Sequence, residues 1–497
     1  MKKLLVFLVA TIACGMAAYA SDDVRQVPYD YGYVYPNDED MTCKLGDFNW
    51  KRLGILNEYI VPEQIEIEGK SYRVVALTDR AFDGWECQVK KIVLPNTITS
   101  LPESVFGANQ HMEEVVLPDG LREIPAQTFS MCTALTKIHL PANLEIIREA
   151  AFRGCTSLET LELPNTTREI HDSAFEQCIK LSTVSLSANL EYLDEDAFNL
   201  SPISEVHIPA NVRKIDGNPF SCCKNLATIT VDEGNQWFRV VDNVLFDKEM
   251  TEIVCYAGQK KDANYTVPST VKTVHGKCFS RCYHINEVIL PEGLETLQNR
   301  AFCQTSLKKC RIPGNTTLSE VTFDECNELE ELEIAEGTKE LDLYLYYVVN
   351  CPTVCLKLPE GLEKLHLSIK TDSLAIPASV KYMNVDIFPK DNQEKPVVFH
   401  MLSPTPPARW KTISTSEVVG PYWNEEYVVR VPKGCKDVYL AHPDWAGKWI
   451  FEEDEVIPTD IDEVKVPYRP ATKRFENGKL VIEKDGRRFN AAGQPVW

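Results

Sequence analysis

The chain has 497 residues, of which 44% are hydrophobic and 25% are charged, an ordinary composition for a globular protein with a sizeable core. Its formal net charge at pH 7 is −21, and no basic stripe occurs along the sequence. Because an acidic surface repels phosphate groups, nucleic acid is excluded as an expected partner.

Residues 1–20 are expected to form a secretion signal. Lys2 and Lys3 supply a positive end, a short apolar run follows, and Ala-Tyr-Ala at 18–20 suits a cleavage site. Lipid attachment at Cys14, as in an outer-membrane lipoprotein, is the alternative. No later segment has about 18 consecutive apolar residues, so the chain is not expected to span a membrane. The mature protein is therefore expected to be extracellular or on the cell surface.

Residues 21–75 are expected to form a β-hairpin cap at the N-terminal end of the core. Residues 29–35 alternate as a strand does, and Glu68-Gly69-Lys70 is typical of a hairpin turn. The cap is expected because the first unit of a stacked array otherwise leaves its core open to water.

Residues 76–389 carry an internal repeat of about 23 residues. The repeating phenylalanines are Phe82, Phe106, Phe129, Phe152, Phe175, Phe198, Phe220, Phe279, Phe302 and Phe323. Prolines follow nearly the same period. A fixed period of this length is typical of a solenoid, in which each unit is too small to fold alone and stacking supplies the core.

The unit from 135 to 158 illustrates the expected turn of the solenoid. Leu135, Ile138 and Leu140 alternate as a short strand does. Pro141-Ala142-Asn143 then predicts a reversal, because proline sets φ and asparagine tolerates the left-handed conformation. The apolar residues at 147, 151 and 155 are four apart, which suggests one helical turn. The sequence thus predicts an α/β solenoid dominated by β structure, with a parallel sheet on one face.

The unit resembles the leucine-rich repeat pattern Leu-x-x-Leu-x-Leu-x-x-Asn, which Leu135, Ile138, Leu140 and Asn143 match. Its Ala-Phe-x-x-Cys element and Leu-Pro strand end are similar to the BspA-type family of bacterial cell-surface leucine-rich repeat proteins, over roughly residues 70–385. The resemblance implies a curved, right-handed superhelix and export to the cell surface. It also implies binding to macromolecules of a host or a neighbouring cell.

Three segments depart from the repeat. Residues 232–268 are expected to be an insertion, in which 238–246 form a hairpin and 251–257 a third strand. Residues 390–460 are expected to form a β-rich C-terminal capping region. In the tail, 461–497, Asn-Gly at 477–478 and Asp-Gly at 485–486 predict small β-hairpins.

Six cysteines recur three residues after a repeating phenylalanine. They are Cys132, Cys155, Cys178, Cys223, Cys282 and Cys326. Stacked in one buried column, their Cβ atoms would lie about 4.8 Å apart, against about 3.8 Å in a disulfide. We therefore expect a column of free thiols that fill space as small apolar groups. Disulfides are the alternative, including one between Cys351 and Cys355.

Nothing in the sequence points to an enzyme. The histidines lack the His-Glu-x-x-His spacing of a zinc site, and neither a Gly-rich phosphate loop nor a Gly-x-Ser-x-Gly elbow is present. The neighbouring cysteine pairs lack a second ligand pair close in sequence, so no metal site is expected. We expect no catalytic residues, no metal and no cofactor.

The outward side chains of the predicted strands, on an expected concave face, form the main candidate binding site. The candidates are Lys137, His139, Glu162, Glu205, His207, Lys309, Arg311, Glu331 and Glu333. Their mixed charges suit protein recognition, whereas their alternation between strands is also typical of a solvated sheet with stabilising cross-strand pairs.

The C-terminal tryptophans form a second candidate site. They are Trp410, Trp423, Trp445 and Trp449. The simplest interpretation makes them the core of the capping region; if exposed, they would stack on sugars or on a protein partner. The leading hypothesis is an exported protein that binds a protein on a host or microbial surface, and the alternative is glycan or nutrient capture by these aromatic residues.

Overall fold

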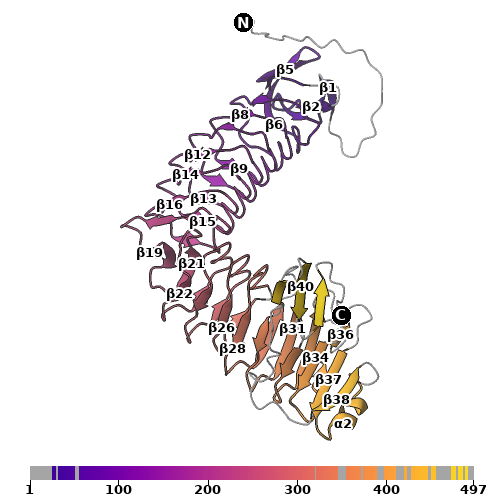
Figure 1. Cartoon of the computed structure of the whole chain (residues 1–497). Helices are drawn as coiled ribbons and strands as arrows, with labels where there is room; N and C mark the ends of the chain where they lie inside the picture. Colours follow the sequence, from indigo (N-terminus) through magenta and orange to yellow (C-terminus); the bar gives the residue numbers. More distant parts are fainter. Residues whose placement is uncertain are drawn as a thin grey trace.

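The chain is an elongated, bent β-solenoid (Figure 1). The computed structural model of the chain describes residues 25–29, 32–50, 55–319, 321–344, 354–370, 373–388, 397–409, 419–421, 427–445, 449–454, 472–476, 479–484 and 487–490. The predicted secretion signal and Cys14 lie outside these residues. None of the helical segments that the structure describes has the length and apolar character of a membrane span.

A five-stranded sheet lies at the N-terminal end of the solenoid, in the order β1-β2-β3-β6-β5. The strands are β1 (Val27–Tyr29), β2 (Gly32–Asn37), β3 (Thr42–Gly46), β5 (Gln64–Ile67) and β6 (Lys70–Leu77). Hairpins join β1 to β2 and β5 to β6, and the latter turns at Glu68 and Gly69, which both have positive φ. The hairpins expected here are therefore present.

A main ladder of short strands runs along one side of the solenoid. Its strands are β4 (Tyr59–Ile60), β7 (Lys91–Val93), β8 (Glu114–Val116), β10 (Lys137–His139), β12 (Thr160–Glu162), β14 (Thr183–Ser185), β16 (Glu205–Ile208), β18 (Thr228–Val231), β22 (Asn264–Thr266), β24 (Glu287–Ile289), β26 (Lys309–Ile312), β28 (Glu331–Ile334) and β30 (Cys355–Lys357). The pairs within it are parallel, so Lys137 lies beside Glu114 of the preceding rung, as one solenoid turn is called here. The parallel sheet predicted from the repeat is confirmed.

A second ladder of two-residue strands, which the sequence did not indicate, follows the Pro-x-Asn turn. Its strands are β9 (Glu123–Ile124), β11 (Ile146–Ile147), β13 (Glu169–Ile170), β15 (Tyr192–Leu193), β17 (Lys214–Ile215), β23 (Thr273–Val274), β25 (Thr296–Leu297) and β27 (Thr317–Leu318). The predicted helical turn after Ile147 is wrong, because Ile147 lies in a strand and turns follow it.

The third side of each rung carries the repeating phenylalanine and is called here the Phe side. Its backbone hydrogen bonds explain why no helix forms there. The N–H of Phe152 donates to the carbonyl of Ala174 in the next rung at 2.7 Å. The N–H groups on either side of it donate to carbonyls three residues back in their own rung. Alternate amides are thus committed to the neighbouring rung, which interrupts the run of bonds that an α-helix needs.

Left-handed residues shape this side. In the rung of Phe152, Ala150 has φ of 52° and Gly154 has φ of 72°, two residues before and two after the ring. Asn143 does not have positive φ, so the left-handed conformation predicted for the Pro-x-Asn turn is wrong in this rung. In later rungs the turn glycines Gly337 and Gly361 do adopt it, at 98° and 91°.

The repeating phenylalanines stack inside the solenoid. Phe152 is fully buried, and its ring centroid lies 5.0 Å from those of Phe129 and Phe175. The contacts run from Phe82 to Phe220 and form a second series from Tyr256 to Phe323. Offset contact of this kind buries a large apolar area at every rung.

The cysteine column is made of free, buried thiols, as expected. Each Sγ also has a specific partner. Cys155 donates to the carbonyl of Phe129 at 3.2 Å, and Cys178 donates to that of Phe152 at 3.3 Å. Burial raises the pKa of the Cys178 thiol to about 12. Cys351 lies outside the described residues, and Cys355 is exposed.

The insertion holds the predicted hairpin, β19 (Phe238–Val241) with β20 (Val244–Asp247), and the predicted third strand, β21 (Glu252–Tyr256). β21 pairs in parallel with β23, so the insertion joins the second ladder. Figure 1 shows the solenoid bending at β19 and β21. The N-terminal arm reaches β18, and the C-terminal arm starts at β22.

Strands β20 and β21, called here the partition sheet, separate two hydrophobic cores. Both faces of the sheet are buried. The residues that pack in the core of the N-terminal arm are Leu245, Val254, Cys255 and Ala257. The residues that pack in the core of the C-terminal arm are Val244, Phe246, Ile253 and Tyr256. The two arms therefore have separate cores that meet at this sheet.

Parallel pairing continues beyond residue 389 to β38. The strands on one side of this part are β29 (Glu340–Tyr344), β31 (Lys364–Lys370), β33 (Tyr382–Phe388), β35 (Ala408–Arg409) and β36 (Val419–Pro421). The strands on the other side are β32 (Ser373–Ile376), β34 (Val397–Met401), β37 (Tyr427–Pro432) and β38 (Ile450–Asp454). One short helix, α2 (Lys436–Ala441), follows β37. In the tail, β39 (Thr472–Glu476), β40 (Lys479–Lys484) and β41 (Arg487–Asn490) form the predicted antiparallel hairpins.

Polar contacts join the two arms across the bend. Lys277, in the first Phe turn after the insertion, forms an ion pair with Asp196 and another with Glu195 at 3.1 Å. Asn218 donates to the carbonyl of Lys277 at 3.0 Å, and Ser280 accepts from the N–H of Cys222 at 2.9 Å. On the Phe side, therefore, residues before the insertion bond directly to residues after it.

Carboxylates crowd the Phe side near this junction, and Asp172 shows the effect most strongly. Burial and the charge of Asp196 raise the pKa of Asp172 to about 6. Because folding raises this pKa, protonation of Asp172 stabilises the folded state. This stabilisation is fully present below pH 3.8 and is lost as the pH rises through about 6. Asp172→Asn is expected to stabilise the protein by about 1 kcal/mol at pH 7.5, the shift being discounted for solvent screening, and to have no effect near pH 4.

Urea unfolding at the two pH values measures this change, with Glu149→Gln on the exposed surface of the same side as the control. A stabilisation that is equal at both pH values would contradict the assignment of the raised pKa to Asp172.

Candidate functional site

The strand face consists of the outward side chains of the main ladder. In β10, Lys137 and His139 are exposed while Ile138 packs against the core. The same alternation exposes Glu162 in β12 and Glu205 in β16. The structure therefore places all nine predicted strand-face residues on one ladder, at outward positions.

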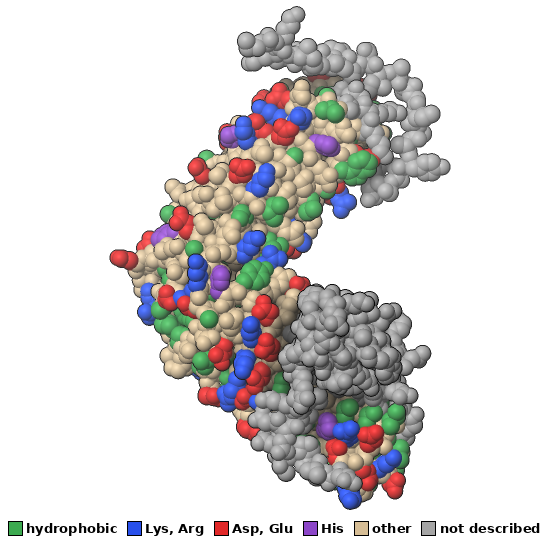
Figure 2. Space-filling view, in the orientation of Figure 1, with side chains coloured by type: hydrophobic (Ala, Val, Ile, Leu, Met, Phe, Trp, Pro, Cys, Tyr) green, Lys and Arg blue, Asp and Glu red, His purple; other side chains and the backbone are tan. Residues whose placement is uncertain are grey.

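The half of this face in the C-terminal arm pairs its charges internally. Lys309 lies 3.1 Å from Glu331, which also contacts Lys357 at 3.0 Å. These bonds lower the pKa of Glu331 below its usual value. Arg311 contacts Glu333 at 2.9 Å. Figure 2 shows acidic and basic side chains intermixed over this arm. Here the predicted cross-strand pairing is the better description.

In the N-terminal arm, the first rungs are paired in the same way, since Lys91 of β7 lies 3.2 Å from Glu114 of β8 and 3.4 Å from Glu58. The middle rungs, from β10 to β16, are different. Across the ranges that the structure describes, Lys137, His139, Glu162 and Glu205 take part in no ion pair. His207 contacts the hydroxyl of Thr230 at 3.0 Å, and its ring nitrogen lies 4.0 Å from Asp232. Exposed charges without opposite partners keep their full capacity to bind a ligand.

The tryptophan candidates separate into buried and undescribed residues. Trp445 is fully buried and donates to the carbonyl of Pro407 at 2.9 Å, and Trp449 is half-buried against the same core. Trp410 and Trp423 lie outside the described residues. Trp445 thus acts as a core residue, which was the simpler of the two interpretations.

The described part of the chain holds no group of three or more histidine, cysteine or acidic side chains that is arranged to bind a metal ion. Cys178 is not placed as a nucleophile either. Its thiol is buried and donates to a carbonyl, and His171 contacts Glu169 at 3.0 Å. A thiol with its pKa raised by burial is a poor nucleophile.

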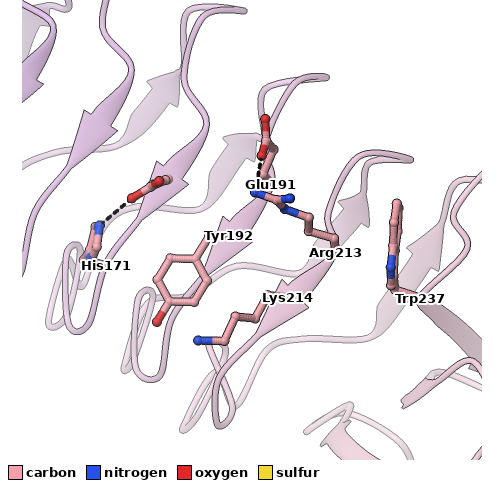
Figure 3. A pocket seen from close by; sticks show the side chains of 7 residues that line it. His171, Glu191, Tyr192, Arg213, Lys214 and Trp237 are labelled. Atoms are coloured by element: carbon pink, nitrogen blue, oxygen red, sulfur yellow. Dashed lines mark hydrogen bonds and ion pairs between the residues drawn. The ribbon is translucent and has the colours of Figure 1, made fainter.

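Sequence reasoning missed a shallow pocket on the second ladder beside the bend, called here the junction pocket (Figure 3). It is lined by Glu169, His171, Glu191, Tyr192, Arg213, Lys214 and Trp237. Six of these belong to β13, β15 and β17 or flank them, and they are aligned by the second ladder, which the sequence did not indicate. The one signal in the sequence was Trp237 at the start of the insertion.

A family model described as BspA type leucine rich repeat region matches residues 75–159, 122–248 and 251–373, with 6 copies. These ranges cover more than half of the chain. No curated protein matches the chain significantly.

Several solved bacterial structures resemble the fold. A leucine rich cell surface protein from Faecalibacterium prausnitzii is 22% identical, with a TM-score of 0.55 over 68% of this chain and 96% of that one. The pneumococcal vaccine antigen PcpA is 19% identical, with a TM-score of 0.49 over 88% and 100%. A leucine-rich repeat protein from Eubacterium ventriosum is 20% identical, with a TM-score of 0.42 over 72% and 82%. At this identity, the first likeness shows the shared fold.

Proposed function

The chain belongs to the BspA-type leucine-rich repeat family, and from this premise we propose that it is an exported surface protein that binds another protein through the strand face of its N-terminal arm. The partner is a protein on a host or microbial surface. Binding is non-covalent, and no catalytic step is involved. Residues 1–20 serve as the secretion signal, with lipid attachment at Cys14 as the other route to the surface.

One contrast carries the proposal. The charges of the strand face are paired with one another in the first rungs and in the C-terminal arm, whereas those between, Lys137, His139, Glu162 and Glu205, are exposed without ion pairs in the described structure. A face whose charges are already paired would lose those bonds on binding, and an unpaired face loses only water. The middle rungs of the N-terminal arm, from β10 to β16, are therefore the favoured binding surface.

The solenoid also keeps the cost of binding low. The side chains stand on rungs joined by parallel backbone bonds, so the backbone beneath the ligand is already ordered. Charges at fixed spacing favour a partner of complementary pattern and accelerate its approach. Association is accordingly expected to weaken as salt concentration rises, because such exposed charges are screened.

Cross-linking from two faces of the same arm tests this proposal. A photo-reactive benzoylphenylalanine is placed at position 162 on the strand face or at position 149 on the Phe side, and each purified protein is irradiated on intact bacterial and host cells. A protein adduct is expected from position 162 alone. The adduct partner is then purified, and Glu162→Lys is expected to weaken its binding at least about tenfold, or about 1.4 kcal/mol.

Glu149→Lys is the matched control, since Glu149 is also an exposed glutamate of the N-terminal arm, and it should leave the affinity unchanged. Equal adduct formation from both positions, or full affinity in Glu162→Lys, would refute binding by the strand face.

A further inference from the structure

The junction pocket lies on a different side of the solenoid from the strand face, so a ligand bound there would add to the proposed function. The pocket is open to solvent and has a volume of about 450 Å³, within the range of small-molecule sites, which is roughly 300–1,000 Å³. Because the pocket has both polar and aromatic walls, it is suited to a ligand with polar edges and an apolar face.

Parallel pairing builds the floor of the pocket. Glu169, Tyr192 and Lys214 lie side by side in register on β13, β15 and β17. Glu191 and Arg213 directly precede β15 and β17 and form a second, adjoining column. The polar groups therefore stand at the spacing of neighbouring strands, about 4.8 Å.

The charges of the pocket balance. Its lining holds two carboxylates, one guanidinium and one ammonium group, so their formal charges cancel with His171 neutral. Glu191 accepts from Arg168 at 2.6 Å and from Arg213 at 2.8 Å. Lys214 contacts Asp216 at 2.5 Å. A lining whose own charges cancel gives no local preference for an anion or a cation.

Two aromatic rings, Tyr192 and Trp237, line the pocket. Figure 3 shows Trp237 at one end, with Arg213 and Lys214 between it and Tyr192, and His171 beyond Tyr192. The hydroxyl of Tyr192 donates to Asp216 at 2.9 Å, which fixes this ring. Trp237 is 45% exposed, so much of its indole is open to a ligand.

The backbone of Trp237 is held in place before any ligand arrives. Its N–H donates to the side chain of Asn235 at 2.8 Å, and its carbonyl accepts from the N–H of Lys248 at 2.7 Å. Asn235 is fully buried and in turn donates to the carbonyls of Pro209 and Val212 in the preceding rung. This anchoring reduces the ordering that binding requires.

We propose that the junction pocket binds a neutral pyranose sugar. A pyranose has no charge, its hydroxyl groups both donate and accept hydrogen bonds, and its C–H face stacks on an aromatic ring. Glu191 and Arg213 keep the bond between them, and their remaining lone pairs and N–H groups supply acceptors and donors to the sugar. The exposed indole of Trp237 supplies the apolar wall.

Methyl glycosides of glucose, galactose, mannose, N-acetylglucosamine and N-acetylgalactosamine are the probes, followed by saturation-transfer NMR and titration, with methyl glycosides of sialic and glucuronic acid as anionic comparisons. At least one neutral glycoside is expected to bind the wild-type chain, and more tightly than either anionic one. Trp237→Ala is expected to weaken that affinity at least about tenfold.

Two matched controls separate the site from general effects. Trp85→Ala removes another exposed indole, in the first Phe turn, and Arg122→Met removes an arginine that pairs with Glu145 in the same column as Arg213 but outside the pocket. Both should bind the sugar normally, whereas Arg213→Met should lose affinity.

Glu162→Lys should also keep sugar binding, so failure of the strand-face proposal and failure of this one are distinguishable. The proposal is overturned if no neutral glycoside binds, if an anionic one binds better, or if Trp237→Ala binds as tightly as the wild type does.

Discussion

Replacing Phe152 with alanine is expected to lower the free energy of unfolding by about 3–5 kcal/mol. The ring is fully buried between those of Phe129 and Phe175, at 5.0 Å from each. Its removal leaves a cavity that the rungs cannot close, because backbone bonds to both neighbouring rungs hold the chain in place. Urea unfolding followed by circular dichroism measures the loss.

Ile179→Ala is the matched control, since Ile179 lies on the Phe side of the next rung with 58% of its surface exposed. Its effect is expected to stay within about 0.5 kcal/mol. If Phe152→Ala unfolded at the same urea concentration as the wild type, the stacked register of the phenylalanines would be incorrect.

Replacing Lys277 with methionine is expected to cost about 2–4 kcal/mol. The side chain of Lys277 is 16% exposed and that of Asp196 is 13% exposed, so the substitution leaves a nearly buried carboxylate without its cation. Burial alone would lower the pKa of Lys277, but its bonds to Asp196 and Glu195 raise it above the ordinary value. The ammonium group is therefore charged at neutral pH, and its loss is felt in both arms.

The double variant Asp196→Asn with Lys277→Met removes both charges and should be more stable than Lys277→Met alone, as calorimetric melting would show. Lys272→Met, which breaks a pair with Glu295 whose side chains are 58% and 63% exposed, should change stability by no more than about 1 kcal/mol. Equal losses of stability from Lys277→Met and Lys272→Met would show that the buried ion pair contributes no more to stability than the exposed one.

Much of the architecture could be predicted from the sequence because one period repeats. The spacing of the phenylalanines and of the strand residues around Ile138 indicated a stacked parallel ladder, and the Ala-Phe-x-x-Cys element indicated the family. The hairpin at Asp242-Asn243 also followed from local turn chemistry, and both residues have positive φ. Each of these features depends either on the repeat period or on a pattern of a few neighbouring residues, and both can be read from the sequence.

The features that were missed depend on contacts between rungs. The apolar residues at 147, 151 and 155 fit a helical turn, but bonds to the next rung take every second amide and leave only turns. The cysteines were expected to fill space alone, and the carbonyl that each one bonds belongs to the rung before it. The junction pocket combines three rungs with the insertion, so no single repeat unit contains its pattern.

The partition sheet governs how this chain tolerates change. Because additional units of about 23 residues attach to existing rungs, either arm is free to grow or shorten without altering the other. The partition sheet has no such freedom, since neighbouring residues such as Val244 and Leu245 serve different cores. Cutting the chain at the bend would expose the core of one fragment to water and leave the other fragment with an exposed apolar sheet face. Each arm thus closes the open end of the other arm's core.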